Sequence, residues 1–213
     1  SVYAPVSAGQ AQALRRAYDA AGYGPETIEL VEAHGTGTKA GDVAEFEGLR
    51  SVYAPAGVGR EQWCALGSVK SQIGHTKAAA GAAGLFKAVM ALHHKVLPPT
   101  IKVERPDPRL AIESSPFYLN THARPWIRAG DHPRRAAVSA FGFGGSNFHV
   151  TLEEYTGPAP RAERLATQSC ELVLLEAGSV ASLITHAEAM LRSELPLANL
   201  AHASRQHWDA TAP

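Results

Sequence analysis

The 213-residue sequence has only two cysteines, Cys64 and Cys170, and no excess of either charge, with 20 basic and 20 acidic residues. Two thiols are too few for the disulfide framework of a small secreted protein, so a reducing compartment is expected. The lack of a basic excess argues against nucleic acid or an anionic membrane surface as a partner, because both attract Lys and Arg. The expected partner is therefore a neutral molecule or another protein.

Long apolar runs and a leader segment are also missing. The longest nearly apolar run, 78–92, is interrupted by Lys87 and is too short to cross a bilayer. The first residues lack the basic and apolar regions of a secretory signal. These absences predict a cytoplasmic location. The sequence does not begin with methionine, which suggests a chain cut out of a longer one.

Apolar periodicity predicts an α/β chain in which strands and helices alternate. Each predicted strand is a compact apolar run bounded by glycine or polar residues: 28–33, 63–69, 117–120, and the hairpin pair 135–141 and 147–153. Two predicted helices, 8–21 and 42–53, have apolar positions three and four residues apart. A third, 76–94, is rich in Ala and Gly on every side. Gly22 is expected to end the first helix.

Two of these helices carry further local signals. Asp42 and Glu45 form a D-x-x-E pattern, which predicts a capping box at the start of the second helix. The third helix consists only of Ala and Gly from 78 to 84, and such small residues let backbones approach closely. We therefore expect the third helix to be buried on all faces between two layers.

A change of composition near Thr156 divides the chain. Residues 157–169 are rich in proline and polar residues, as in a linker. One more strand, 171–176, and one more helix, 179–192, are expected after this segment. The expected domains are therefore 1–156 and 157–213.

Two of the ten histidines stand where predicted strands end. His34 follows the first strand and His75 follows the second, and each lies beside a glycine-bearing turn. Ligands bind at the carboxyl ends of strands in α/β sheets, where two imidazoles could donate hydrogen bonds or carry protons. Position alone leaves two interpretations open: a shared site, or two histidines that only cap their turns.

Other polar residues accompany these histidines. Thr36 and Thr38 supply hydroxyl groups, and the glycines between them would let a polar ligand approach the backbone. Lys70 could contact a substrate. A lysine at the exit of a buried strand is more often held by a carboxylate, and this structural role is favoured.

The sequence gives little support for a metal site or a nucleophilic cysteine. Neither C-x-x-C nor H-E-x-x-H occurs, so no metal is expected. Cys64 lies inside a predicted buried strand and is expected to be unreactive. No helix follows the loop Gly142-Phe-Gly-Gly-Ser-Asn147, which argues against dinucleotide binding. Its glycines instead favour exposed backbone N–H groups, as in an oxyanion hole.

Three motifs together resemble the β-ketoacyl synthases: His34-Gly-Thr-Gly-Thr38, Lys70-Ser-Gln-Ile-Gly-His75 and Gly142-Phe-Gly-Gly-Ser-Asn147. They occur in that family's order and at roughly its separations. The similarity runs from Ser1 to Tyr155 and is closest to ketosynthase domains of polyunsaturated fatty acid synthases and iterative type I polyketide synthases. The segment after Thr156 is similar, less specifically, to the linker between ketosynthase and acyltransferase domains.

The resemblance implies a thiolase-like layered fold, a homodimer, and decarboxylative Claisen condensation of malonyl-carrier protein with an acyl thioester. It implies that this chain is the carboxy-terminal half of a ketosynthase, since neither Cys64 nor Cys170 matches the family's nucleophilic cysteine. The amino-terminal half would be a partner, and so would an acyl carrier protein. The carrier's phosphopantetheine arm would deliver the thioesters, and no cofactor would be bound directly.

The resemblance also implies roles for individual residues. His34 and His75 match the two family histidines, neutral donors that stabilise the enolate. Phe143 matches the residue whose backbone N–H helps to hold an oxyanion and whose ring gates the acyl pocket. Four further residues are expected to bind substrate: Thr36, Thr38, Phe141 and Gly142. Of these, the two threonines would hold the phosphopantetheine arm. Lys70 and Asn147 are expected to support the site.

Two alternatives to an intact ketosynthase stay open. A truncated fragment without turnover, acting only as an interaction module, would have the same sequence. Such a lone half is expected to expose a broad apolar face and to associate. A decarboxylase-type ketosynthase with Gln in place of the nucleophilic Cys is a third option, which only upstream sequence would exclude.

Overall fold

The computed structural model describes residues 4–103, 105–128, 130–157 and 170–206. The chain forms two compact units, Ser1–Thr156 and Gly157–Pro213. The second unit contains helices α5 (Val180–Leu191) and α6 (Leu197–Gln206), and α5 confirms the helix expected over 179–192. Most of the expected linker, 158–169, lies outside the described residues.

The strand expected over 171–176 is not formed. A strand needs a neighbour to take up its backbone hydrogen bonds, and the described part of the second unit contains no other strand. The prediction of a strand from this apolar run is therefore wrong.

A five-stranded sheet with the order β4-β2-β1-β6-β7 forms the centre of the first unit. The first four strands in this order are parallel, and β7 runs antiparallel to β6, with Phe141 opposite Asn147. The expected hairpin is thus confirmed. The strands of this sheet are β1 (Leu30–Glu32), β2 (Cys64–Gly67), β4 (Phe117–Leu119), β6 (Arg135–Phe141) and β7 (Asn147–Glu153). A second, small sheet pairs β3 (Val96–Leu97) with β5 (Arg124–Pro125).

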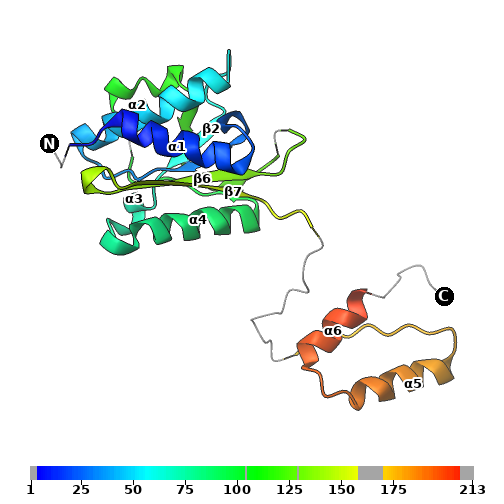
Figure 1. Cartoon of the computed structure of the whole chain (residues 1–213). Coiled ribbons are helices and arrows are strands. Elements are labelled where there is room, and N and C mark those ends of the chain that lie inside the picture. Colours follow the sequence, from blue (N-terminus) through cyan, green and yellow to red (C-terminus); the bar gives the residue numbers. More distant parts are fainter. Residues whose placement is uncertain (1–3, 104, 129, 158–169, 207–213) are drawn as a thin grey trace. The chain divides into compact units, whose positions relative to one another are not determined.

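Helices cover both faces of the five-stranded sheet (Figure 1). Helices α1 (Ser7–Ala21) and α2 (Lys39–Ala56) lie on one face, and α4 (Ala80–His94) lies on the other. The expected layered α/β architecture is therefore confirmed. Short helical turns connect these elements: η1 (Pro25–Thr27), α3 (Lys70–Ile73), η2 (Lys77–Ala79), η3 (Pro108–Leu110), η4 (Ile112–Ser114) and η5 (Phe143–Gly145).

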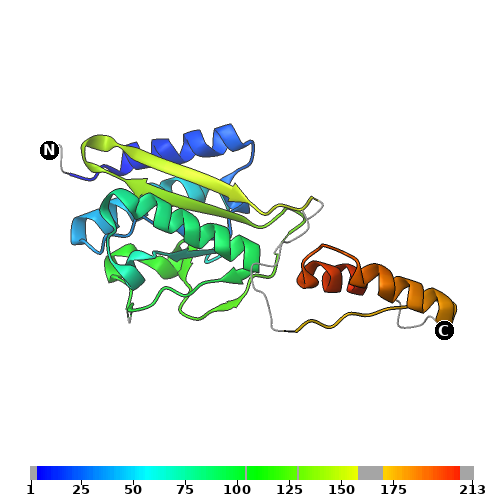
Figure 2. The ribbon, with the colours of Figure 1, turned by 90° about the horizontal axis from the view of Figure 1, so that it is seen from below.

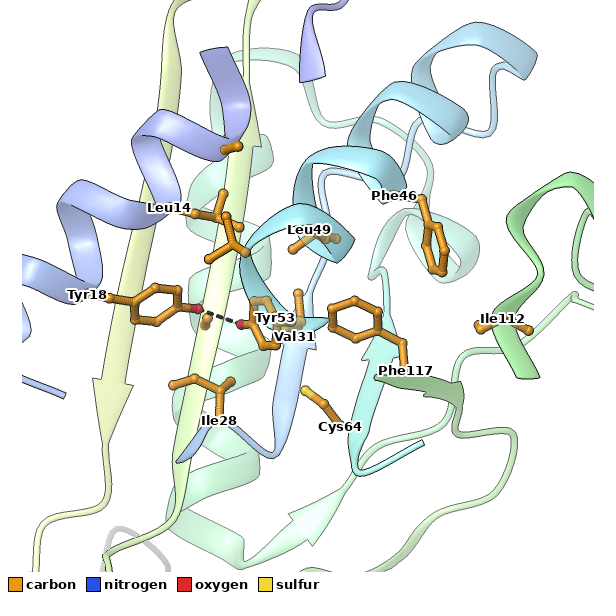
Figure 3. Close-up of a cluster of buried hydrophobic side chains, with 13 residues drawn as sticks. Leu14, Tyr18, Ile28, Val31, Phe46, Leu49, Tyr53, Cys64, Ile112 and Phe117 are labelled. Atoms are coloured by element: carbon orange, nitrogen blue, oxygen red, sulfur yellow. Dashed lines mark hydrogen bonds between the residues drawn. The ribbon is translucent and has the colours of Figure 1, made fainter. Parts of the chain in front are cut away.

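Successive strand residues enter two different apolar cores, because side chains alternate across a strand. Val31 belongs to the core beneath α1 and α2, whereas Leu30 belongs to the core beneath α4. Figure 3 shows the first core, in which the hydroxyl groups of Tyr18 and Tyr53 lie 2.5 Å apart. Cys64 is fully buried in the same core, and this burial raises the pKa of its thiol. The expected burial of Cys64 is thus confirmed.

Helix α4 is buried on one face only, so the expectation of burial on all faces is wrong. Gly84 and Ala88 are buried, whereas Leu85, Phe86 and Val89 are 37%, 67% and 44% exposed. In Figure 2, α4 lies in front of the sheet, with the long strands β6 and β7 in view beside it. Within the described residues of this unit, α4 packs mainly against strands of the five-stranded sheet and also contacts β3 and η2. The small residues thus predicted that α4 packs closely, but not how many of its faces are covered.

Candidate active site

His34 and His75 lie side by side, with ring centroids 5.5 Å apart and ring planes 86° apart. His34 follows β1, and His75 follows α3 and Gly74, whose φ of 74° turns the chain. Both histidines line one cavity of about 1590 Å³ in the first unit. Because β1 and β2 are adjacent and parallel, their carboxyl ends bring both rings to the same edge of the sheet.

The environment keeps the His34 ring neutral near pH 7. Burial, assisted by the nearby Lys70 and His75, lowers the pKa of His34 to about 4. In the described part of the chain, no hydrogen-bond partner reaches its buried Nδ1 atom. The Nδ1 atom of His75 accepts a hydrogen bond of 3.0 Å from the backbone N–H of Lys77, so a neutral His75 ring carries its proton on Nε2. The neutral His34 ring and the Nε2 atom of His75 can therefore both present N–H donors.

A buried carboxylate holds the start of the loop that carries His34. The carboxylate of Glu45, in α2, accepts hydrogen bonds from the backbone N–H groups of His34 at 2.7 Å and Gly35 at 2.8 Å. Burial raises the pKa of Glu45 to about 7, although these two hydrogen bonds act in the opposite direction. Glu45 therefore fixes the backbone of His34 and leaves the His34 ring free to face the cavity.

A second carboxylate, that of Asp42, binds the same loop near the start of α2. Asp42 accepts a hydrogen bond of 3.1 Å from the backbone N–H of Gly37. Helix α2 begins at Lys39, with Thr38 as the N-cap residue, whose side chain accepts from the N–H of Gly41. The expected capping box of Asp42 with Glu45 is therefore wrong. Both carboxylates bind the loop before the helix, which the spacing of the residues alone does not reveal.

The glycine hairpin between β6 and β7 also lines the cavity. The backbone N–H of Gly142 donates a hydrogen bond of 2.8 Å to the carbonyl oxygen of Ser146, which closes the turn. The Phe143 side chain is 76% exposed. The ring of Phe141 lies near that of His34, with centroids 5.9 Å apart. The loop and the histidines thus line one cavity, a proximity that their order in the sequence does not show.

Most of the remaining expected site residues also line this cavity. The hydroxyl groups of Thr36 and Thr38 are 3.3 Å apart, and Asn147 lines the cavity from the start of β7. Lys70 does not line it, as judged over the described residues. Burial lowers the pKa of Lys70, and the charges of Glu32 and Glu45 partly oppose this effect.

Within the described residues, no carboxylate holds Lys70 directly, although this structural role was the favoured interpretation. No ion pair within 4 Å involves Lys70 in the described parts of the chain. The nearest carboxylates are already engaged: Glu32 pairs with Lys87 at 2.7 Å, and Glu45 binds the His34 loop. The charge of Lys70 helps to lower the pKa of His34.

Sequence reasoning missed Glu32 and Lys87 altogether. Glu32 is the last residue of β1, and Lys87 lies in α4. The available signal was a charged residue inside an apolar strand, in Leu30-Val-Glu-Ala33, together with a single lysine inside an apolar helix. Charged residues in such positions are almost always paired.

The cavity has no cysteine and no metal-ligand cluster among its described residues. The residues that line it do not include Cys64, which lies in the core. Over the described ranges, no three His, Cys, Asp or Glu residues are placed to hold a metal ion. Within the same ranges, no helix has both the length and the apolar character needed to span a membrane.

Comparison with known families matches almost the whole chain. Residues 1–104 match the family described as "Beta-ketoacyl synthase, C-terminal domain", and residues 106–211 match "Ketoacyl-synthetase C-terminal extension". Polyketide synthase PksL of Bacillus subtilis is 44% identical over 89% of this chain, and one subunit of the polyunsaturated fatty acid synthase of Thraustochytrium is 44% identical over 94%. The chain spans only 4% and 8%, respectively, of the length of these two relatives.

Solved structures show the same likeness. The ketosynthase from module 6 of the bacillaene synthase of Bacillus subtilis is 40% identical, with a TM-score of 0.71. The match covers 96% of this chain and 35% of that one. A ketosynthase from module 1 of the bacillaene synthase of Bacillus amyloliquefaciens matches with a TM-score of 0.69 at 38% identity. The layered fold described above is thus the thiolase-like fold of these ketosynthases.

Proposed function

The chain belongs to the β-ketoacyl synthase family, as a ketosynthase carboxy-terminal domain and its extension, and we propose that it supplies two of the three catalytic side chains of a condensing enzyme. The reaction is decarboxylative Claisen condensation of malonyl-carrier protein with an acyl thioester, in fatty acid or polyketide synthesis. The observation that carries the proposal is the contact of His34 with His75 in the cavity lined by the glycine hairpin.

The two histidines act in the decarboxylation step. When the malonyl thioester loses CO2, the electron pair of the broken C–C bond forms an enolate, whose charge lies largely on the thioester oxygen. N–H donors aimed at this oxygen bind the transition state more tightly than the substrate, because the charge develops only as the bond breaks. The low pKa of His34 keeps its ring neutral, so it donates a hydrogen bond without becoming a competing cation at neutral pH.

The glycine hairpin acts in the condensation step. The enolate carbon attacks the carbonyl carbon of the acyl thioester, a new C–C bond forms, and the carbonyl oxygen becomes an oxyanion. The backbone N–H of Phe143 holds this oxyanion together with that of the nucleophilic cysteine, which the family carries in its amino-terminal half. Collapse of the oxyanion expels the cysteine thiolate. Phe141 and Gly142 contact the acyl substrate, and the exposed Phe143 ring gates the acyl pocket.

The other partners follow from the same assignment. An acyl carrier protein delivers both thioesters on its phosphopantetheine arm, and the adjacent hydroxyl groups of Thr36 and Thr38 hold this arm. Lys70 organises the charge around His34, and Asn147 fixes the hairpin. No further cofactor is required. The assembled enzyme is a homodimer in the cytoplasm.

An open apolar face extends from α4 to the edge strand β7, where Phe148 is 67% exposed. The amino-terminal half of the ketosynthase is the partner that covers this face. A monomeric domain rarely leaves such a continuous apolar surface in water. The exposed apolar residues of the face are Leu85, Phe86, Val89, Phe148 and Val150.

Substitution of His34 in the full-length synthase tests the assignment. His34→Ala is expected to leave acyl loading of the nucleophilic cysteine measurable and to lower malonyl decarboxylation by about 10² or more, because a transition-state donor is lost. His93→Ala, at the exposed end of α4, is the matched control and is expected to keep the parental rate. Decarboxylation by His34→Ala at the parental rate would remove His34 from the mechanism.

A second candidate is that the 213-residue chain by itself is an interaction module without turnover. The lack of a cysteine among the described residues that line the cavity favours it. The purified chain, incubated with acyl and malonyl carrier proteins, is expected to give no β-ketoacyl product and to associate in light scattering. Robust product formation would overturn this candidate.

A further inference from the structure

A buried ion pair involves the strand that leads to His34. The Oε2 atom of Glu32 and the Nζ atom of Lys87 are 2.7 Å apart, and their side chains are only 2% and 10% exposed. Glu32 ends β1, two residues before His34, and Lys87 projects from α4. Removing two charges from water is costly, so a buried pair is weak evidence for stability alone.

The second oxygen of the same carboxylate reaches the segment that leads to the other histidine. The Oε1 atom of Glu32 accepts a hydrogen bond from the backbone N–H of Val69. Val69 follows β2 and opens the short segment that runs through α3 to His75. Glu32 belongs to the strand that leads to His34, and its carboxylate therefore ties this strand to the segment that leads to His75. Lys87 contacts the same carboxylate from a third element.

The helix is shaped to admit this carboxylate. A Cβ atom at Gly84 would lie 3.1 Å from Cγ of Glu32 and 3.2 Å from Cγ1 of Val138, which is closer than almost all such contacts. Gly84 therefore lets α4 approach the sheet closely enough for Lys87 to reach Glu32. The Glu32 carboxylate also acts as a nearby negative charge on Lys70, at the start of the same segment.

We propose that Glu32 and Lys87 are positioning residues, which hold the segment 68–75 in register with β1 and so set the distance between His75 and His34. The inference rests on the proposed condensing function, because the two histidines must aim at one oxygen atom. A displacement of about 1 Å in such a pair lowers the rate by up to about 10²-fold. Loading of the cysteine does not require this alignment.

The test uses three variants of the full-length synthase. Lys87→Met leaves the Glu32 carboxylate without its partner, and Glu32→Asp keeps the charge but shortens the side chain by one methylene. Both are expected to lower malonyl decarboxylation by about tenfold or more while acyl loading stays at the parental rate. Lys95→Met is the matched control, since it removes an ion pair of 3.6 Å between the exposed Lys95, just beyond the same helix, and Glu154. This variant is expected to keep both rates.

The outcomes separate this inference from the function on which it rests. Parental decarboxylation in Glu32→Asp would overturn the positioning role. A parallel loss of loading and decarboxylation in Glu32→Asp would overturn it as well, because that is the effect of a merely structural pair. Glu32→Asp decides the question even if Lys87→Met does not fold. Parental decarboxylation in His34→Ala would instead refute the proposed function itself.

Discussion

Glu45 makes the stability of the first unit depend on pH, and Glu45→Gln is expected to remove this dependence. Burial raises the pKa of the Glu45 carboxyl group from 4.5 to about 7, against the hydrogen bonds from Gly35 and His34 that lower it. Between these two values the folded chain binds more protons than the unfolded chain. The free energy of unfolding therefore falls as the pH rises through this window.

The structure sets the size of the effect. The shift of the Glu45 pKa from 4.5 to about 7 corresponds to about 3 kcal/mol, since one pKa unit is worth about 1.4 kcal/mol. This contribution is fully present below the unfolded value and lost above the folded one. His34 acts in the opposite direction, because its pKa is lowered from 6.5 to about 4 and its titration makes the unfolding free energy rise with pH over that window. Comparison of the variant with the parent cancels the effect of His34.

Urea unfolding of the 213-residue chain, followed by circular dichroism near pH 5 and near pH 8, measures the difference. Between these conditions the parent is expected to lose about 2.5 kcal/mol more stability than Glu45→Gln, because pH 5 already lies slightly above the unfolded pKa of 4.5. Glu47→Gln, on the exposed side of the same helix, is expected to behave like the parent. The same pH dependence in Glu45→Gln and the parent would refute the argument from burial.

Two further substitutions probe the core beneath α1 and α2. Leu49→Ala is expected to lower the unfolding free energy by about 2–5 kcal/mol in urea unfolding, because Leu49 is buried and its loss leaves a cavity. A change below about 1 kcal/mol would contradict the close packing of Leu49 in this core. Tyr18→Phe removes a hydroxyl that bonds both the Tyr53 hydroxyl at 2.5 Å and Nε2 of His149 at 3.0 Å, and about 1–3 kcal/mol is expected to be lost in the same assay. An unchanged midpoint in Tyr18→Phe would show that neither hydrogen bond contributes.

The boundary between the two family matches does not coincide with the boundary of the compact unit. The first match ends at residue 104, whereas the first unit extends to Thr156. Strands β4, β6 and β7 lie in the second match, and β6 pairs directly with β1. The histidines and the glycine hairpin therefore come from different matched regions and depend on a single sheet.

Local patterns in the sequence determined most of the elements and one part of the site. The helical spacing before Gly22 predicted α1, and the two strand-like runs on either side of the glycine loop predicted the β6–β7 hairpin. His34 and His75 were singled out because each follows a strand end, and such positions depend on short stretches of chain that the sequence shows directly. The family resemblance rested on motifs of the same short range.

Only the tertiary structure decided what the buried charges contact and how many sides of a helix are covered. Asp42 and Glu45 have the spacing of a capping box, but their carboxylates hold the preceding loop, because the loop folds back over the start of α2. Glu32 and Lys87 are far apart in the sequence and meet only when α4 packs on the sheet. Periodicity along the chain indicates which residues face inward. The contacts between residues far apart in the sequence depend instead on how whole layers of helices and strands pack together. No local pattern in the sequence specifies these contacts.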